Sequence, residues 1–232
     1  MPRIFDNIET LLLPALKESL ELSNRADFSI GYFNLRGWGE LASFIDNWDG
    51  EQEVCRVLVG MQKLPNEELK ETLSLLEYRS GIDNQAVSLL KQEMAEQFRQ
   101  QLTIGAPTNR DEKTLRLLAA QLRDGKVAVK LFLRHALHAK LYLLFRNDPN
   151  NPITGFLGSS NLTISGLAKQ GELNVDVLDQ DACLKLAKWF KDRWEDKYCI
   201  DISKELAEII EESWAREKLI PPYHIYLKMA YH

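Results

Sequence analysis

Apolar positions recur at helical spacing at the start of the chain and alternate with polar ones soon afterwards. Residues 8–22 carry apolar side chains three or four positions apart, which predicts an amphipathic helix that begins or kinks near Pro14. Residues 26–34 alternate as a strand does, residues 37–48 return to the helical period, and residues 53–61 favour a second strand. The first quarter of the chain is therefore expected to run helix, strand, helix, strand.

The rest of the chain divides into a helical middle, a group of strands and a helical end. Residues 66–124 keep a helical pattern that glycine and proline interrupt at positions 80–81 and 103–109, so three helices are expected there. Short segments rich in β-branched and aromatic residues predict four strands, at residues 127–135, 138–147, 153–161 and 173–179. Helical patterns then cover residues 181–198 and 203–217.

This order of elements predicts an α/β fold in which a mixed β-sheet is sandwiched by helices on both faces. With 232 residues, 45% of them hydrophobic and 27% charged, the chain is of globular composition and can bury a sizeable core. We expect one domain over residues 1–200 and a C-terminal helical extension over residues 201–232. The aromatic end of that extension would suit either a connection to a further domain or a docked segment.

The sequence carries no signal for export or for membrane insertion. No apolar run approaches the roughly 18 residues of a membrane span, and residues 1–24 lack the apolar core and cleavage site of a signal peptide. The three cysteines include no Cys-x-x-Cys pair, so buried, reduced thiols are expected rather than disulfides or a zinc site. We therefore expect a cytoplasmic protein with no membrane partner.

Charge limits the ways in which the chain could bind nucleic acid. The formal net charge is −5 and the pI is about 5.5, so contact with a polyanion would require a local basic patch. Six basic residues gather in the second half of the chain: Lys126, Lys130, Arg134, Lys140, Arg146 and Lys169. They would suit a phosphate backbone, and an ordinary solvated face is an equal alternative.

Polar residues that could act together lie at the ends of neighbouring predicted strands. His138 and Lys140 should share a strand face, and a hairpin would bring the Gly-Ser-Ser-Asn of residues 158–161 beside them. Glu172 begins the next strand. An imidazole can attack phosphorus, a carboxylate can orient it, and lysine and asparagine can hold phosphoryl oxygens. The pattern indicates phosphodiester chemistry without a metal or another cofactor.

These residues resemble the phospholipase D superfamily, whose His-x-Lys, Gly-Ser-x-Asn and downstream glutamate match residues 138–140, residues 158–161 and Glu172. The family aspartate is replaced by Phe145, with Asp148 three residues further on, and the segment between the first two motifs is longer than usual. Both departures are similar to metal-independent restriction endonucleases and to nuclease-like domains that precede bacterial helicase domains.

The resemblance implies a role for each residue. His138 would form a covalent phosphohistidine, Lys140 and Asn161 would bind phosphate, and Glu172 would orient His138. The family pattern favours Ser159 as the serine that contacts phosphate, and a tight turn is the alternative role for it. Further candidates for substrate binding are Ser160, Arg36 in a strand-to-helix loop, and Lys169.

The sequence contains one His-x-Lys, whereas the reaction needs one imidazole to attack and another to protonate the leaving group. The other histidines, His135, His224 and His232, begin no second motif. A homodimer that places both copies of His138 in one shared site would supply the pair. His135 is expected to be a packed or rim residue.

Taken together, the sequence predicts a homodimeric, metal-independent phosphodiesterase that acts on DNA in preference to RNA, as part of a restriction or helicase-type protein. The preference for nucleic acid over lipid rests on the resemblance and on the missing membrane anchor. The alternative is a dimeric nucleic-acid-binding or targeting module with little or no catalytic activity.

Overall fold

The computed structural model describes residues 2–52, 54–60, 84–102 and 109–212. Its strands are β1 (Ile4–Phe5), β2 (Arg25–Ile30), β3 (Cys55–Gly60), β4 (Val127–Phe132), β5 (Lys140–Phe145), β6 (Ile153–Gly158), β7 (Asn174–Val177) and β8 (Cys199–Asp201). Its helices are α1 (Leu12–Glu21), α2 (Leu35–Trp38), α3 (Ala42–Ile45), α5 (Asn84–Leu102), α6 (Asn109–Arg123), α7 (Ile164–Ala168), α8 (Gln180–Trp194) and α9 (Ser203–Glu212).

The strands form one mixed sheet in the order β1-β7-β6-β5-β2-β3-β4-β8. β2, β3 and β4 pair in parallel, and the neighbours on either side of them pair antiparallel. The carboxyl ends of β2, β3, β4 and β6 therefore lie at the same end of the sheet as the amino ends of β5 and β7. Ligands of open α/β sheets commonly bind at such an end.

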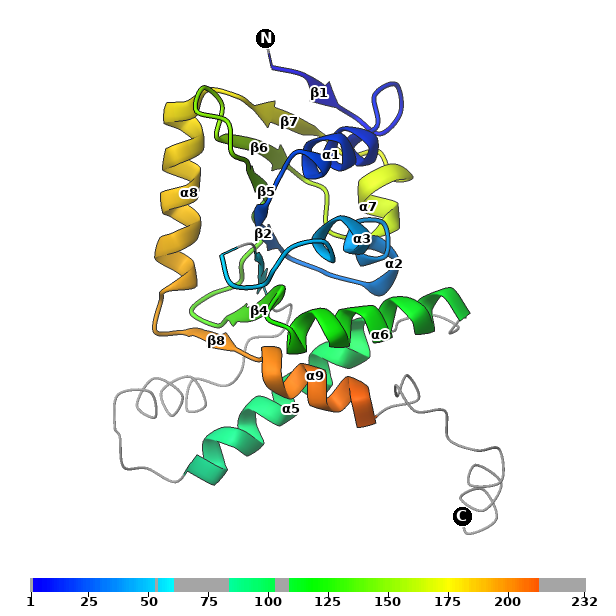
Figure 1. Ribbon diagram of the computed structural model, residues 1–232, viewed down its shortest axis with the longest axis vertical. Coiled ribbons are helices and arrows are strands. Elements are labelled where there is room, and N and C mark those ends of the chain that lie inside the picture. Colours follow the sequence, from blue (N-terminus) through cyan, green and yellow to red (C-terminus); the bar gives the residue numbers. More distant parts are fainter. Residues whose placement is uncertain (1, 53, 61–83, 103–108, 213–232) are drawn as a thin grey trace.

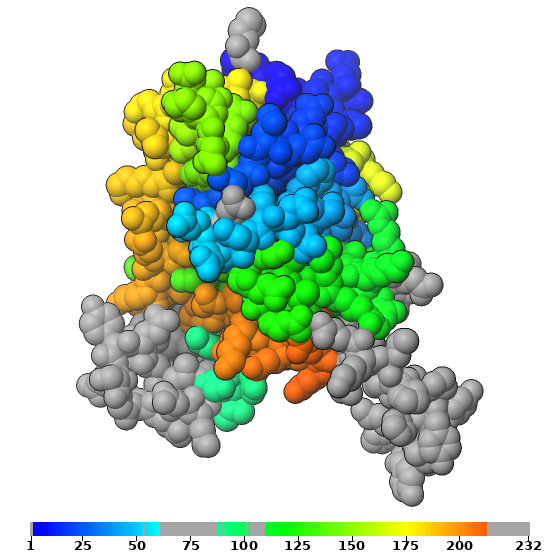
Figure 2. Space-filling view, viewed as in Figure 1, coloured from blue at the N-terminus to red at the C-terminus, as the bar shows by residue number. Residues whose placement is uncertain are grey.

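Helices cover both faces of the sheet, which confirms the predicted α/β architecture (Figure 1). On one face, Phe28, Tyr142 and Phe156 belong to a large core that also includes side chains of α1, α2, α3, α5, α6 and α9. On the other face, a smaller core forms between the sheet and α8, which runs alone along that flank (Figure 2). The three cysteines are buried, and none of them forms a disulfide.

Several elements are shorter than their sequence patterns suggest. The predicted strand 127–135 ends at Phe132, and one further backbone hydrogen bond joins the N–H of Leu133 to the carbonyl of Tyr198. The predicted helix 37–48 is divided into α2 and α3. The edge strands β1 and β8, of two and three residues, are too short to produce a period in the sequence. The first helix expected in residues 66–124 lies largely outside the described residues.

Helix α1 begins two residues before Pro14, as the predicted start near this proline requires. Pro14 occupies the first turn, where backbone N–H groups have no partner inside the helix, so its missing donor costs nothing there. At the other end of the domain, α9 packs against α5 and α6 and adds Leu206 and Ile210 to the large core. The first residues of the expected extension are therefore packed against the sheet domain.

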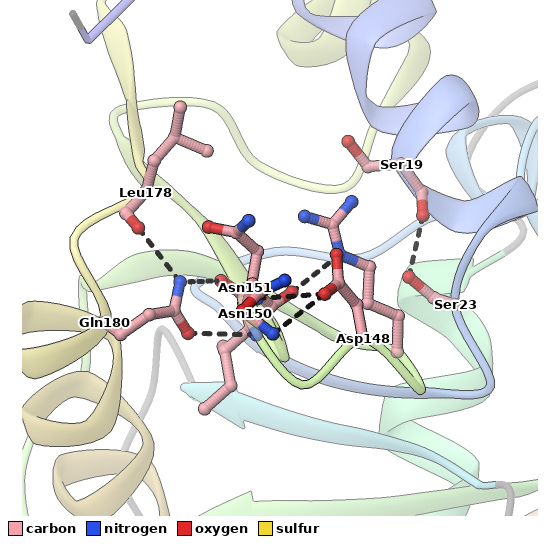
Figure 3. Close-up of polar contacts among 9 residues, drawn as sticks. Ser19, Ser23, Asp148, Asn150, Asn151, Leu178 and Gln180 are labelled. Carbon is pink, nitrogen blue, oxygen red and sulfur yellow. Dashed lines mark hydrogen bonds and ion pairs between the residues drawn. The ribbon is translucent and has the colours of Figure 1, made fainter.

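The β5–β6 hairpin turns at the end of the sheet remote from Lys140. Asp148 accepts hydrogen bonds from the backbone N–H groups of Asn150 (2.9 Å) and Asn151 (3.2 Å), which lower the pKa of its carboxyl (Figure 3). Gln180 of α8 bonds both the N–H and the carbonyl of Ile153. Asp148 therefore shapes the turn, and β5 and β6 separate it from the motif residues.

A buried carboxylate connects the two central strands. Asp27 of β2 is fully buried and accepts two hydrogen bonds of 2.6 Å from Arg56 of β3, with Arg25 at 3.0 Å. The Arg56 guanidinium lies over the ring of Phe190 from α8, 5.1 Å from its centroid. The pair stabilises the register between β2 and β3 and attaches α8 to the sheet.

Replacing Arg56 with methionine should leave the Asp27 carboxylate buried with only one partner. Because a buried charge that loses its partner is costly, we expect the free energy of unfolding to fall by about 3 kcal/mol, measured by urea denaturation. Lys185→Met, which removes an exposed pair with Asp181, is the control and should change stability only slightly. Equal effects of the two substitutions would contradict this role for Asp27 and Arg56.

Candidate active site

His138 and Lys140 lie at the start of β5, at the end of the sheet where the carboxyl ends of the parallel strands meet. His138 is exposed and precedes the strand by two residues, and Lys140 Nζ donates a hydrogen bond of 2.7 Å to the His138 carbonyl. The backbone just before His138 packs closely against Gly60 at the end of β3. A Cβ added at Gly60 would lie only 2.1 Å from the carbonyl oxygen of Leu137, so no larger side chain fits there. The lysine amine is thus folded back over the backbone of the histidine.

The hairpin register brings the second motif beside the first. Lys140 pairs with Gly158, so the Gly-Ser-Ser-Asn segment follows directly at the same end of the sheet. This pairing confirms the hairpin that the sequence predicts between the two motifs. It results from continuous antiparallel pairing from Phe145–Ile153 to Lys140–Gly158.

Asn161 connects the second motif to the end of β2. Its Oδ1 accepts hydrogen bonds from the backbone N–H groups of Gly31 (3.1 Å) and Tyr32 (2.9 Å). Two donors facing one oxygen determine the orientation of the amide, so Nδ2 is the group left to donate elsewhere. A Cβ added at Gly31 would lie 3.3 Å from Asn161 Oδ1 and 3.4 Å from Lys140 Nζ. The two side chains therefore meet at Gly31.

Ser159 and Glu172 form a second polar pair. The Ser159 hydroxyl donates to the Glu172 carboxylate and accepts from the backbone N–H of Leu173 at 3.0 Å. The backbone N–H of Glu172 donates to the carbonyl of Asp6 at 3.2 Å. Within the described part of the chain, Glu172 makes no hydrogen bond with the imidazole of His138. Orientation of His138 by Glu172 stays a prediction.

Ser160 is directed into the protein, unlike its neighbour Ser159. It is fully buried, and its backbone N–H and hydroxyl bond the Oδ1 and Nδ2 atoms of Asn174 at 3.2 and 2.8 Å. Its carbonyl accepts a hydrogen bond of 2.9 Å from the Tyr142 hydroxyl. In this arrangement Ser160 holds the loop that carries Ser159 and Asn161.

Three supporting residues were not identified from the sequence: Gly31, Tyr142 and Asn174. Burial, together with the negative charge of Glu172, raises the pKa of Tyr142, so its hydroxyl remains a neutral donor. A polar residue at a buried strand position was the available signal for Asn174. The signal for Gly31 was weaker, because glycine after a strand is common in loops.

The remaining candidates lie away from this cluster. Arg36 and Lys169 line a cavity with the start of α6, where Arg36 pairs with Asp111 at 3.6 Å. Other members of the expected basic patch make structural contacts elsewhere, such as Arg134 with Asp196 and Arg146 with the carbonyl of Asn151. His135 is exposed and packs edge-on against Phe132, as a rim residue does.

The grouped residues provide an ammonium, an amide N–H₂, a carboxylate and an exposed imidazole. Such donors can bind phosphoryl oxygens, and the imidazole can act as a nucleophile. Within residues 2–52, 54–60, 84–102 and 109–212, no group of three or more His, Cys, Asp or Glu side chains could hold a metal ion. No helix among the described residues is long and apolar enough to span a bilayer.

The chain matches a family model and several solved structures. Residues 54–194 match the model described as cardiolipin synthase, PLD-like domain. Nuc from Salmonella typhimurium, a phospholipase D family member, is 10% identical with a TM-score of 0.50, over 87% of this chain and 97% of that one. Phosphatidylserine synthase from Haemophilus influenzae Rd KW20 is 11% identical with a TM-score of 0.51, over 91% and 43%.

NucT from Helicobacter pylori is 13% identical with a TM-score of 0.48, over 87% of this chain and 98% of that one. No curated protein matches the chain. At these identities, the likeness to Nuc and to the synthase concerns the fold.

Asn174→Ala should weaken the loop that carries the second motif. The change removes both partners of the buried Ser160 groups, so we expect a loss of about 2 kcal/mol in the free energy of unfolding. Thermal and urea denaturation would measure it, with the exposed Asn47→Ala as a matched control. An Asn174→Ala protein as stable as the control would mean that Asn174 does not hold the loop.

Proposed function

Because the chain belongs to the cardiolipin synthase, PLD-like domain family, we propose that it is a metal-independent phosphodiesterase that cleaves DNA as a homodimer in the cytoplasm. The observation that carries the proposal is the meeting of Lys140 and Asn161 at Gly31, with Lys140 folded over the backbone of His138. Two donors there can bind the non-bridging oxygens of a phosphodiester beside an exposed imidazole.

The proposed reaction has two displacements. His138 of one subunit attacks phosphorus, the P–O bond to the leaving group breaks, and His138 of the partner subunit gives that oxygen a proton. Water then attacks the phosphorus and loses its proton to the partner's imidazole, while the P–N bond to His138 breaks, which restores both histidines. Lys140 and Asn161 stabilise the pentavalent phosphorane, and Glu172 orients the nucleophile once it leaves the Ser159 hydroxyl.

The choice of DNA depends on more than the fold. The folds of Nuc and of phosphatidylserine synthase resemble this chain about equally, so likeness of fold does not separate nucleic acid from lipid. The motif resemblance to restriction-type nucleases supports DNA, as do Arg36 and Lys169 in a cavity that follows the motif loops. We also propose that the chain serves a restriction or helicase-type protein.

A binding or targeting module is the second candidate. It is favoured by the hydrogen bond from Ser159 to Glu172, which occupies the carboxylate that should orient His138. An enzyme would have to exchange this bond when substrate binds. A module that only holds DNA would keep it.

Substitution of His138 separates the two candidates. In excess EDTA, we expect the wild-type protein to cleave labelled DNA and His138→Ala to be slower by about a thousandfold or more, because the nucleophile is gone. The matched control is His135→Ala, which removes another exposed histidine three residues earlier and should cleave normally. Cleavage by His138→Ala at the wild-type rate would contradict the proposed mechanism. If the wild-type protein and both variants bind DNA but none of them cleaves it, the binding or targeting module is favoured.

An uncovered apolar strip beside the site supports the homodimer. On the α8 side of the sheet, cross-strand pairing aligns Leu141, Leu157, Val175 and Ile4. Leu141, at the inner end of the row, is 1% exposed, Val175 is partly buried, and Leu157 and Ile4 are 38% and 62% exposed. Leu173, directly after Glu172, is 65% exposed. Because one chain supplies a single His138, a second copy seated on this strip would complete the site.

Subunit mixing tests the shared site. If both copies of His138 act together, adding an equal amount of His138→Ala protein and allowing exchange should reduce wild-type activity to about half, since mixed dimers are inactive. A monomeric enzyme would be unaffected.

Two versions of the inactive protein locate the interface. His138→Ala with Ile4→Glu should no longer inhibit, because the charge prevents apolar contact. His138→Ala with Leu184→Glu changes an equally exposed leucine on α8 and should still inhibit. Equal inhibition by both proteins would place the interface elsewhere.

A further inference from the structure

A cavity of about 240 Å³ opens where α2, α6 and α7 converge. These helices lie one above another along the right-hand side of the molecule (Figures 1 and 2). Leu35 and Ile164 provide apolar wall, and Gly39 lies so near α6 that an added Cβ would be 3.0 Å from Thr114 Oγ1. Charged lining residues are Arg36, Glu40, Arg110, Asp111 and Lys169.

The carboxylates of this cavity are already paired with cations. Glu40 bonds Lys17 and Arg110, each at 2.6 Å, and the hydrogen bond from Lys17 is the main reason that the pKa of Glu40 is lowered. Asp111 pairs with Arg36. Lys169 has no carboxylate partner in the described part of the chain. The lining therefore holds three cations and two carboxylates, a net charge of +1, and Lys17 beside Glu40 adds a further positive charge. This excess of positive charge favours an anionic ligand.

The cavity lies close to the active site, because two of its lining residues come shortly after the loops that carry Gly31 and Asn161. Asn161 is three residues before Ile164, and Gly31 is four residues before Leu35. The two loops are joined by the backbone hydrogen bond of 3.2 Å from Asn34 to Leu162. Three residues of extended chain span at most about 11 Å, so the cavity wall begins within that distance of Asn161. At about 3.4 Å of rise per nucleotide of a stacked strand, this upper limit corresponds to about three nucleotides.

We propose that this cavity is a subsite for the bound strand, two or three nucleotides from the scissile phosphate. Lys169 and Arg110 contact a backbone phosphate there, and Leu35 and Ile164 pack against the sugar or base of the same nucleotide. Lys169 and Arg110 therefore act on a flanking phosphate and leave the scissile one to Lys140 and Asn161. Arg36 lines the same cavity, where it pairs with Asp111. The inference rests on the proposed function for the position of the scissile phosphate.

The subsite predicts how binding affinity depends on the length of the bound oligonucleotide. Fluorescence anisotropy would follow binding of labelled oligothymidylates of increasing length to the full chain carrying His138→Ala, which prevents cleavage. We expect affinity to rise in a step once the strand extends two or three nucleotides beyond the active site. Adding Lys169→Ala or Arg110→Gln should remove the step and reduce the salt slope of log K by about 0.7, the loss of one phosphate contact on a single strand.

The matched control is Lys185→Ala, which removes an exposed lysine from α8 and should keep both the step and the slope. Identical behaviour of the Lys169→Ala and Lys185→Ala proteins, or the lack of a step in their common parent, would overturn the subsite. Hydrolysis of bis(4-nitrophenyl) phosphate by the wild-type protein in EDTA tests the catalytic proposal separately, because this small diester does not reach the cavity. A binding step without hydrolysis would retain the subsite and reject the phosphodiesterase.

Discussion

The site depends on one side chain that accepts two backbone hydrogen bonds. Asn161 Oδ1 receives the N–H groups of Gly31 and Tyr32, which follow the central strand β2. These backbone donors lie past the last residues of β2 that pair with β3 and β5, so the asparagine continues the hydrogen bonding beyond these two ladders. The same contact leaves Nδ2 as the group that can donate elsewhere, and the Lys140 amine also lies at Gly31. The Asn161 amide therefore both stabilises the end of β2 and belongs to the proposed phosphate-binding site.

The rest of the cluster keeps this arrangement rigid. Tyr142 and Asn174 satisfy the buried polar groups of Ser160, so the loop between β6 and α7 is held from beneath as well as by Asn161. Ser159 faces outward and meets Glu172. A loop whose buried groups are all bonded can present its exposed groups with little loss of entropy when a ligand binds. Stabilisation of a phosphoryl transition state requires donor groups that are held in place in this way before the substrate binds.

Two surfaces extend from the same end of the sheet and would serve the two proposed partners. The apolar strip that includes Leu157 and Ile4 lies on the α8 side and suits a second subunit. The cationic cavity lies across the motif loops, between α2, α6 and α7, and suits a nucleic-acid strand. Their separation would let dimer formation and strand binding occur together. The net charge of −5 is compatible with this, because the cations that matter are local.

Local patterns in the sequence determined the element types, the α/β class and the hairpin that joins the two motifs, because periodicity and turn residues report on neighbouring positions. They also predicted that His138, Lys140, Asn161 and Glu172 act as a set. They did not indicate the short edge strands, the burial of Ser160, or the meeting of Asn161 with Gly31, 130 residues away in the chain. Those features depend on strand order and on which buried groups lack partners, and such relations exist only once the sheet has brought distant segments together. The tertiary structure alone therefore separated the donors at the proposed scissile phosphate from the cations that line the cavity.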